Sequence, residues 1–111
     1  FKTMKETFGE YIHKLRVDNS LTLTKLAAAL DIDQSTLSKI ENNKRSVPEE
    51  ILPKLAKVFQ LDRKKLDKEF YSEKIATLIY KEDNSTELFQ LAEEKVKYLR
   101  LKSTKQGKLK I

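Results

Sequence analysis

The sequence predicts an all-α protein, and three observations lead to this fold class. Its 111 residues include only two glycines and two prolines, too few for the many tight turns of an all-β domain. Apolar residues recur three and four positions apart along several segments, which is the spacing of one helix face. Residues that cap helices precede several of these segments. We therefore expect a helical domain followed by a C-terminal helical extension.

The first two helices are predicted from their apolar faces. A helix over about residues 5–17 presents one face, made of Phe8, Tyr11, Ile12 and Leu15. The second helix begins after Thr22, the N-cap candidate, and ends before Asp31. Its inward residues are Leu26, Ala27 and Leu30.

The third and fourth helices are separated by a polar loop over residues 42–46. Asp33 is the predicted N-cap of the third helix, which turns Leu37 and Ile40 inward. Pro48 opens the fourth helix, and Pro53 must lie within or just past its first turn, because proline in a helix interior costs about 3 kcal/mol. The inner face of this helix consists of Ile51, Leu52, Leu55, Ala56 and Phe59.

The extension after residue 62 is predicted to be helical as well. Asp62 caps a helix that carries Leu66 and Phe70, and this helix either runs through Ser72 or restarts there. The segment "KIATLIY" has enough β-branched residues for a strand, but we favour a helix. After a break at 83–85, Ser85 caps a last helix over about 86–101, and residues 103–111 form a basic tail.

Composition narrows the classes of function. The chain has no cysteine and a single histidine, His13, so disulfides and Cys/His metal sites are excluded and no cofactor is expected. No apolar run approaches the ~18–20 residues of a membrane span, and without a signal peptide the expected compartment is the cytoplasm. We interpret residues 1–3 as a remnant that precedes a natural start at Met4.

The net charge of +6 is not spread evenly along the chain. Residues 95–111 contain seven basic side chains and no acid, whereas the first 94 residues hold 16 basic and 17 acidic ones. The basic excess therefore belongs to the C-terminus and is no evidence that the N-terminal domain binds nucleic acid.

The segment "LTKLAAALDIDQSTLSKIENNKR" resembles the helix-turn-helix family of the phage lambda repressor and Cro proteins, the XRE-type regulators. The resemblance covers about residues 8–62. The family usually has glycine where this chain has Asp31 and Asn43, and both residues tolerate the left-handed backbone that these positions need. It often has glutamine, a phosphate contact, where this chain has Leu23.

This resemblance implies that the third helix, about residues 34–41, enters the major groove of double-stranded DNA. The residues expected to contact base edges are Gln34, Ser35, Thr36, Ser38 and Lys39. The residues expected to contact phosphates are Thr22, Thr24, Asn42, Lys44 and Arg45. Alignment with the family also implies a structural ion pair between Arg16 and Glu41. His13 is expected to be a surface residue.

The predicted domains are residues 4–62 for DNA binding, 63–102 for dimerisation and 103–111 for the tail. The apolar faces of the extension lack an obvious core, and another copy would cover them most simply. The predicted dimer contacts are Leu66, Phe70, Ile75, Leu78, Ile79, Leu88, Leu91 and Leu99. The alternative is that the extension folds back as a monomer. The tail could attract phosphates, bind an acidic partner or be solvated.

The leading hypothesis is therefore a sequence-specific DNA-binding regulator that binds a pseudo-palindromic operator as a homodimer. It would act as a repressor or as the control protein of an operon, such as a restriction–modification system. The rival is an antitoxin-type interaction protein whose C-terminal helices bind a protein partner and whose DNA binding is autoregulatory. An enzyme is not expected, since the chain has no Gly-rich phosphate loop and no paired carboxylates in a plausible pocket.

Overall fold

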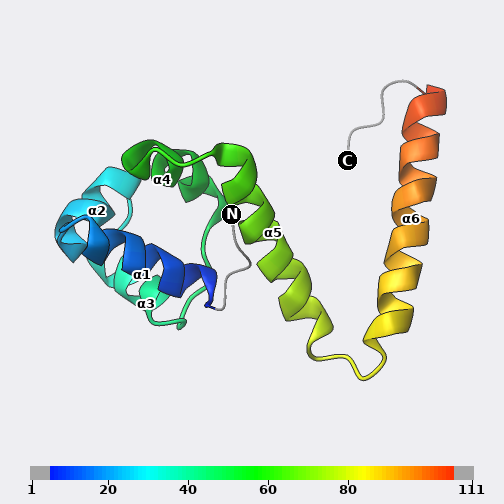
Figure 1. The fold of residues 1–111 in the computed structure, drawn as a ribbon, viewed down its shortest axis with the longest axis horizontal. Coiled ribbons are helices and arrows are strands. Elements are labelled where there is room, and N and C mark those ends of the chain that lie inside the picture. The colour runs from blue at the N-terminus through cyan, green and yellow to red at the C-terminus, as the bar shows by residue number, and fades with distance from the viewer. Residues whose placement is uncertain (1–5, 107–111) are drawn as a thin grey trace. The chain divides into compact units, whose positions relative to one another are not determined.

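The computed structural model describes residues 6–106, and the regular secondary structure of this part of the chain is all helical, as predicted (Figure 1). The helices are α1 (Phe8–Asp18), α2 (Leu23–Leu30), α3 (Gln34–Glu41), a 3₁₀ turn η1 (Glu49–Ile51), α4 (Leu52–Phe59), α5 (Arg63–Ile79) and α6 (Ser85–Gln106). None of the described helices is long and apolar enough to cross a membrane. The chain divides into two compact units, one ending at Lys74 and one beginning at Ile75.

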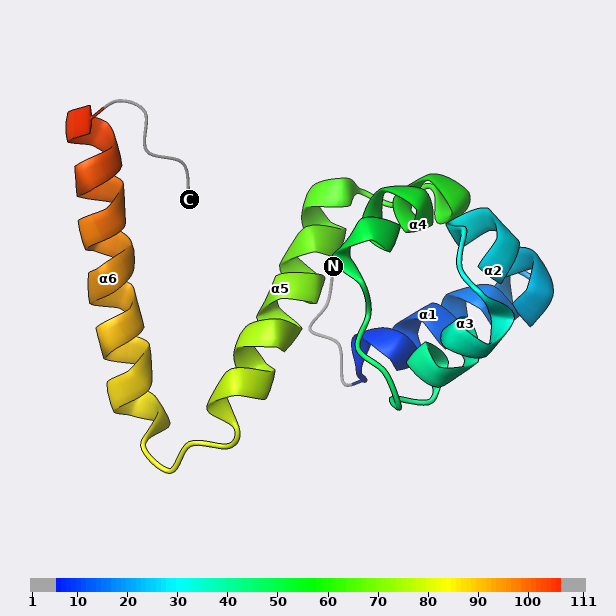
Figure 2. The same cartoon turned by 180° about the vertical axis from the view of Figure 1, so that it is seen from behind.

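The first unit has a closed apolar core. Helix α3 packs against both α1 and α2, and α2 also contacts α4 (Figure 2). The core is formed by Phe8, Ile12, Leu26, Ala27, Leu30, Leu37, Ile40, Ile51, Leu52, Leu55, Leu66 and Phe70. Most of the residues predicted to face inward on α1, α2 and α3 are therefore buried in one core. Leu66 and Phe70, from the start of α5, belong to the same core.

This core corrects two predictions about the extension. Leu66 and Phe70 were predicted to contact a second copy, but their side chains are only 0% and 3% exposed within one chain. The Phe70 ring packs edge-on against Phe8, and the backbone N–H of Phe8 donates to Glu73 at 2.8 Å. The first half of α5 therefore completes the N-terminal core, which extends beyond residue 62.

The helix starts follow local capping chemistry. Thr7 caps α1 in a capping box with Glu10, and the Thr22 side chain accepts a hydrogen bond from the N–H of Lys25 at the start of α2. Asp33 occupies the N-cap of α3, but its side chain makes no capping hydrogen bond. The turn η1 precedes α4, and α4 begins only at Leu52. Pro53 therefore lies in the first turn of α4, as expected.

Four successive helices end in a residue with a left-handed backbone, and none of the four is glycine. Asp31 and Asn43 have φ angles of 58° and 62°, as their predicted roles require, and Ser20 and Gln60 have φ angles of 56° and 52°. At Asn43, the next N–H, of Lys44, donates to the carbonyl of Lys39 at 2.8 Å. This bond and its companion to Ile40 form a Schellman motif that satisfies the last carbonyls of α3.

The second unit consists of the last turn of α5, a short connection and α6. Helix α5 runs through Ser72 without a break, and residues 75–79 are helical rather than a strand. The cap of α6 was predicted at Ser85, but Asn84 stands there instead, with its side chain bonded to Glu87. Helix α6 also extends to Gln106, four residues into the predicted tail, and the rest of that tail lies outside the described residues.

Candidate nucleic-acid interface

Helix α3 is fixed to the core by its apolar side and by a close approach to α1. Leu37 and Ile40 are 0% and 1% exposed. A Cβ atom added at Gly9 would collide with the carbonyl oxygen of Ile40, so only glycine fits where α1 crosses α3. This requirement was not identified from the sequence, although a glycine inside a helix is a signal for such a contact.

The predicted ion pair between Arg16 and Glu41 is present. Nε of Arg16 lies 2.8 Å from Oε2 of Glu41, and Nη2 lies 3.0 Å from Oε1. The Glu41 side chain is only 3% exposed, and Arg16 also donates to the carbonyl of Leu21. The pair therefore connects α1 to the end of α3, and Arg16 also holds the connection between α1 and α2.

His13 adds a contact that the sequence did not predict. Its Nδ1 atom lies 2.7 Å from Oε1 of Glu41, while half of its side chain remains exposed. Burial disfavours the charged form of Glu41, but hydrogen bonds from Arg16 and His13 outweigh burial and hold the pKa of this carboxyl below its usual 4.5. Glu41 is thus a buried carboxylate held by two side chains of α1.

Asn43 connects the loop after α3 to the start of α1. Its Oδ1 accepts from the Thr7 hydroxyl at 2.6 Å, and its Nδ2 donates to Glu10 at 2.8 Å. The bonds from the Thr7 N–H and from Asn43 lower the pKa of the Glu10 carboxyl. Glycine, the residue usual in the family, could adopt this backbone but could not make these bonds. Asn43 therefore both adopts the left-handed backbone and supplies the side-chain bonds to α1.

The opposite side of α3 carries the predicted base-contact residues. Gln34, Ser35 and Lys39 are exposed, and Thr36 and Ser38 are partly buried. The Thr24 hydroxyl donates to Oε1 of Gln34 at 2.7 Å, so α2 holds the first side chain of α3 in place. Thr24 was predicted as a phosphate contact, and its observed partner is Gln34.

The predicted phosphate contacts lie at both ends of this face. The Thr22 hydroxyl caps α2, and the Asn42 amide donates to the carbonyl of Ser38 at 2.8 Å. Lys44 and Arg45 are exposed in the loop that follows. Leu23, where the family often has glutamine, is partly buried against the core, which explains an apolar residue at this position.

The remaining predicted dimer residues lie in the second unit. Ile75, Leu78, Leu88 and Leu91 are exposed, and Ile79 and Leu99 are partly buried. Among residues 6–106, no group of three or more His, Asp or Glu side chains is arranged to hold a metal ion.

Comparison with known proteins agrees with this geometry. Residues 12–66 match a protein family described as Helix-turn-helix. The HTH-type transcriptional repressor RghR of Bacillus subtilis (strain 168) is 37% identical over 57 residues, which are 50% of this chain and 42% of that protein. The chain thus matches less than half the length of this curated relative. No solved structure matches significantly. Residues 12–66, just under half of the chain, therefore form a helix-turn-helix domain, and the resemblance predicted from the sequence is confirmed.

Proposed function

We propose that this protein is a transcriptional regulator that binds a specific double-stranded DNA sequence, with α3 as the recognition helix in the major groove. One observation carries the proposal. Helix α3 is held by buried Leu37 and Ile40 and by the Glu41 network, while Gln34, Ser35 and Lys39 face outward. A rigid helix with hydrogen-bonding side chains near its N-terminus suits the major groove, where each base pair has a distinct pattern of donors and acceptors.

Gln34 is the strongest candidate for reading a base. The Thr24 hydroxyl occupies one lone pair of Gln34 Oε1, which leaves the second lone pair and both Nε2 hydrogens available. An amide held in this way can accept from N6 of an adenine and donate to N7. Lys39 can donate to O6 and N7 of a guanine. Ser35, Thr36 and Ser38 offer hydroxyls to either kind of base.

The phosphate backbone supplies the general part of the affinity in this proposal. Lys44 and Arg45 follow α3 directly and are exposed, so they can neutralise phosphates and release counterions. Thr22 and Asn42 can each offer one remaining hydrogen to a phosphate oxygen, because their observed bonds leave one free. Binding should therefore weaken steeply as the salt concentration rises.

Repression from a pseudo-palindromic operator is the form of regulation that we favour, since one such domain reads only a few base pairs. A two-fold dimer places two recognition helices one DNA turn apart, ~34 Å. The relative described as a transcriptional repressor supports the same direction of regulation. The second candidate is an antitoxin-type protein that binds DNA as autoregulation, and it is favoured by the apolar side chains that α6 leaves exposed.

Selection of bound duplexes from random DNA by the full chain tests the proposal. A pseudo-palindromic motif should emerge, and Gln34→Ala should relax one position in each half-site. Lys14→Ala, on the exposed side of α1, is the matched control and should select the unchanged motif. Failure of the wild-type protein to enrich any motif would exclude a sequence-specific regulator.

A further inference from the structure

The second unit exposes the apolar side chains that a folded domain normally buries. None of the side chains described in α6 is buried, although the helix is 22 residues long. Leu78, Phe89 and Tyr98 are 70%, 54% and 61% exposed. In proteins most of the stability of a helix comes from packing of its apolar face, so an uncovered helix of this kind needs a surface to pack against.

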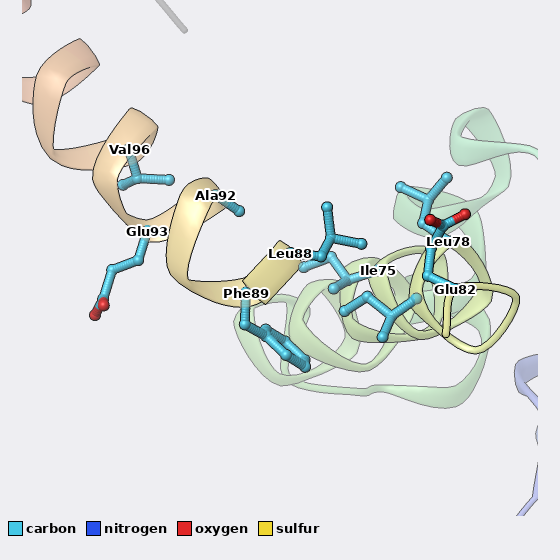
Figure 3. A pocket seen from close by; sticks show the side chains of 9 residues that line it. Ile75, Leu78, Glu82, Leu88, Phe89, Ala92, Glu93 and Val96 are labelled. Carbon is cyan, nitrogen blue, oxygen red and sulfur yellow. The ribbon is translucent and has the colours of Figure 1, made fainter. Parts of the chain in front are cut away.

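A groove within this unit collects part of that apolar surface. It has a volume of about 590 Å³ and lies between the last turn of α5 and the first half of α6 (Figure 3). Its lining is apolar apart from two carboxylates, Glu82 and Glu93. The apolar lining residues are Ile75, Leu78, Ile79, Leu88, Phe89, Ala92 and Val96.

Charges on α6 are segregated along its length. Residues 85–94 contain three acidic side chains and no basic one, whereas residues 95–106 contain five basic side chains and no acidic one. The change of sign falls between Glu94 and Lys95, near the middle of the helix. All of the groove residues on α6 except Val96 lie in the acidic half.

Interactions within α6 do not account for this arrangement. The helix dipole acts on charges in the first and last turns, whereas Glu93, Glu94 and Lys95 lie in the middle. Glu93 and Lys97 are four residues apart, but no salt bridge joins them. The described ion pairs of the chain all lie before residue 75, and Glu87 accepts a hydrogen bond from the uncharged Asn84 amide, so no described ion pair neutralises the charges of α6.

We propose that the occupant of this groove is the second unit of another copy of the chain, with the two α6 helices antiparallel. In that orientation the basic half of one α6 lies along the acidic half and the groove of the other. Its exposed apolar residues, such as Leu101 at 57%, supply the side chains to fill the groove. A parallel arrangement would instead place acids against acids and bases against bases.

Two-fold symmetry makes this contact reciprocal, because each copy offers both a groove and a basic half-helix. Such an isologous interface closes as a dimer and leaves no second groove open. This inference rests on the proposed function in one respect, namely that a dimer is what pairs two recognition helices on one operator. It does not depend on which DNA sequence they bind.

Sedimentation of the full chain without DNA tests the contact. Leu78→Glu should raise the dimer dissociation constant on the order of tenfold or more, because it places a charge in the groove. Val17→Glu is the matched control, since Val17 is 53% exposed on α1, and it should leave association unchanged. Circular dichroism of each variant verifies that the helices remain.

The role of charge is tested by Glu93→Lys combined with Glu94→Lys, which makes both halves of α6 basic. Antiparallel helices should then repel each other, and the dimer dissociation constant should rise by about tenfold or more. Asp18→Lys with Glu50→Lys changes the net charge equally in the first unit and should have little effect. In a parallel dimer, where like halves face each other, the α6 double variant would not add repulsion.

Cross-linking reads the orientation directly, since the chain has no cysteine of its own. Thr86→Cys and Lys102→Cys place thiols about 24 Å apart along α6, from its rise of about 1.5 Å per residue. A mixture of the two variants should form the mixed disulfide faster than either variant cross-links alone. Faster self-linking of each variant would overturn the antiparallel orientation.

A wild-type chain that sediments as a monomer at all accessible concentrations would overturn the inference. A dimer that is insensitive to Leu78→Glu would also overturn it. Since these measurements contain no DNA, a monomer that still selects a DNA motif would leave the proposed function standing. Binding of a different protein in the groove, with no self-association, would favour the antitoxin-type alternative and count against a second copy.

Discussion

The two units of this chain are both helical, yet they differ in how they use their apolar residues. In the first unit, twelve apolar residues from every helix form one core, and even a glutamate, Glu41, is buried and paired. In the second unit, none of the side chains described in α6 is buried. The first unit has the closed core of an independently stable domain, whereas the second exposes the apolar surface expected of an interaction element.

This difference indicates where specificity and assembly reside. The reading side of α3 needs a fixed support, and the first unit supplies it with side chains from α1 and α2. The face of α6 has no such support within the chain, so its stability depends on what covers it. DNA recognition and association are thus proposed for different units and can be altered separately by mutation.

The largest expected contrast comes from the same substitution made in each unit. Leu37→Ala should lower the free energy of unfolding by about 2–5 kcal/mol, because the side chain is 0% exposed and leaves a cavity. Leu78→Ala, at 70% exposure, should change it by less than about 0.5 kcal/mol when measured at monomer dilutions. Chemical denaturation measures both. Equal losses would mean that the units share one core.

The buried carboxylate should matter more than an exposed one. Glu41→Gln should cost about 3 kcal/mol near neutral pH, since it leaves Arg16 partly buried without its charged partner. Asp67→Asn breaks the exposed pair with Arg63 and should cost at most about 0.5 kcal/mol.

The pH dependence of this difference gives a further check. The pKa of Glu41 is lowered from 4.5 in the folded protein, so the folded state releases its proton more readily than the unfolded chain does. Its contribution is therefore complete above pH 4.5 and is lost as the pH falls through the lower folded pKa. The wild-type advantage over Glu41→Gln should shrink in acid. An advantage that grows in acid would contradict the assigned direction.

Gly9→Ala tests the close approach of α1 to α3. The new methyl group would collide with the Ile40 carbonyl, so α3 must shift, at a cost of about 1–3 kcal/mol. Lys14→Ala, elsewhere on α1, has no such neighbour and should be close to neutral. Thermal unfolding distinguishes the two, and equal midpoints would show that the helices separate easily.

The smallest effect is expected at the left-handed helix ends. Gln60→Gly should stabilise the first unit by about 0.5 kcal/mol, because glycine adopts a φ of 52° without strain. Asn43→Gly should not stabilise it, since the bonds to Thr7 and Glu10 are lost. If both glycine variants gained stability alike, the side chain of Asn43 would have no structural role.

The local features of α2 and α3 could be predicted from sequence because they depend on nearby residues. Thr22, Asp31 and Asn43 have caps or backbone angles that follow from residue type. The contact of Gly9 with Ile40 and that of His13 with Glu41 could not be derived in this way, because each depends on how two helices cross. Leu66 and Phe70 were assigned to a dimer for a related reason. Their helical spacing identifies an apolar face, but not the surface that covers it.

The central claim is that recognition resides on the outward side of α3 and not in the basic C-terminus. The most direct measurement compares affinities for a selected duplex and a scrambled duplex of equal length, at one salt concentration. Gln34→Ala should lower the ratio of the two affinities at least about tenfold, from the loss of a bidentate contact, and leave binding to the scrambled duplex unchanged. An unchanged ratio in Gln34→Ala, together with a ratio that collapses when residues 103–111 are removed, would contradict the claim.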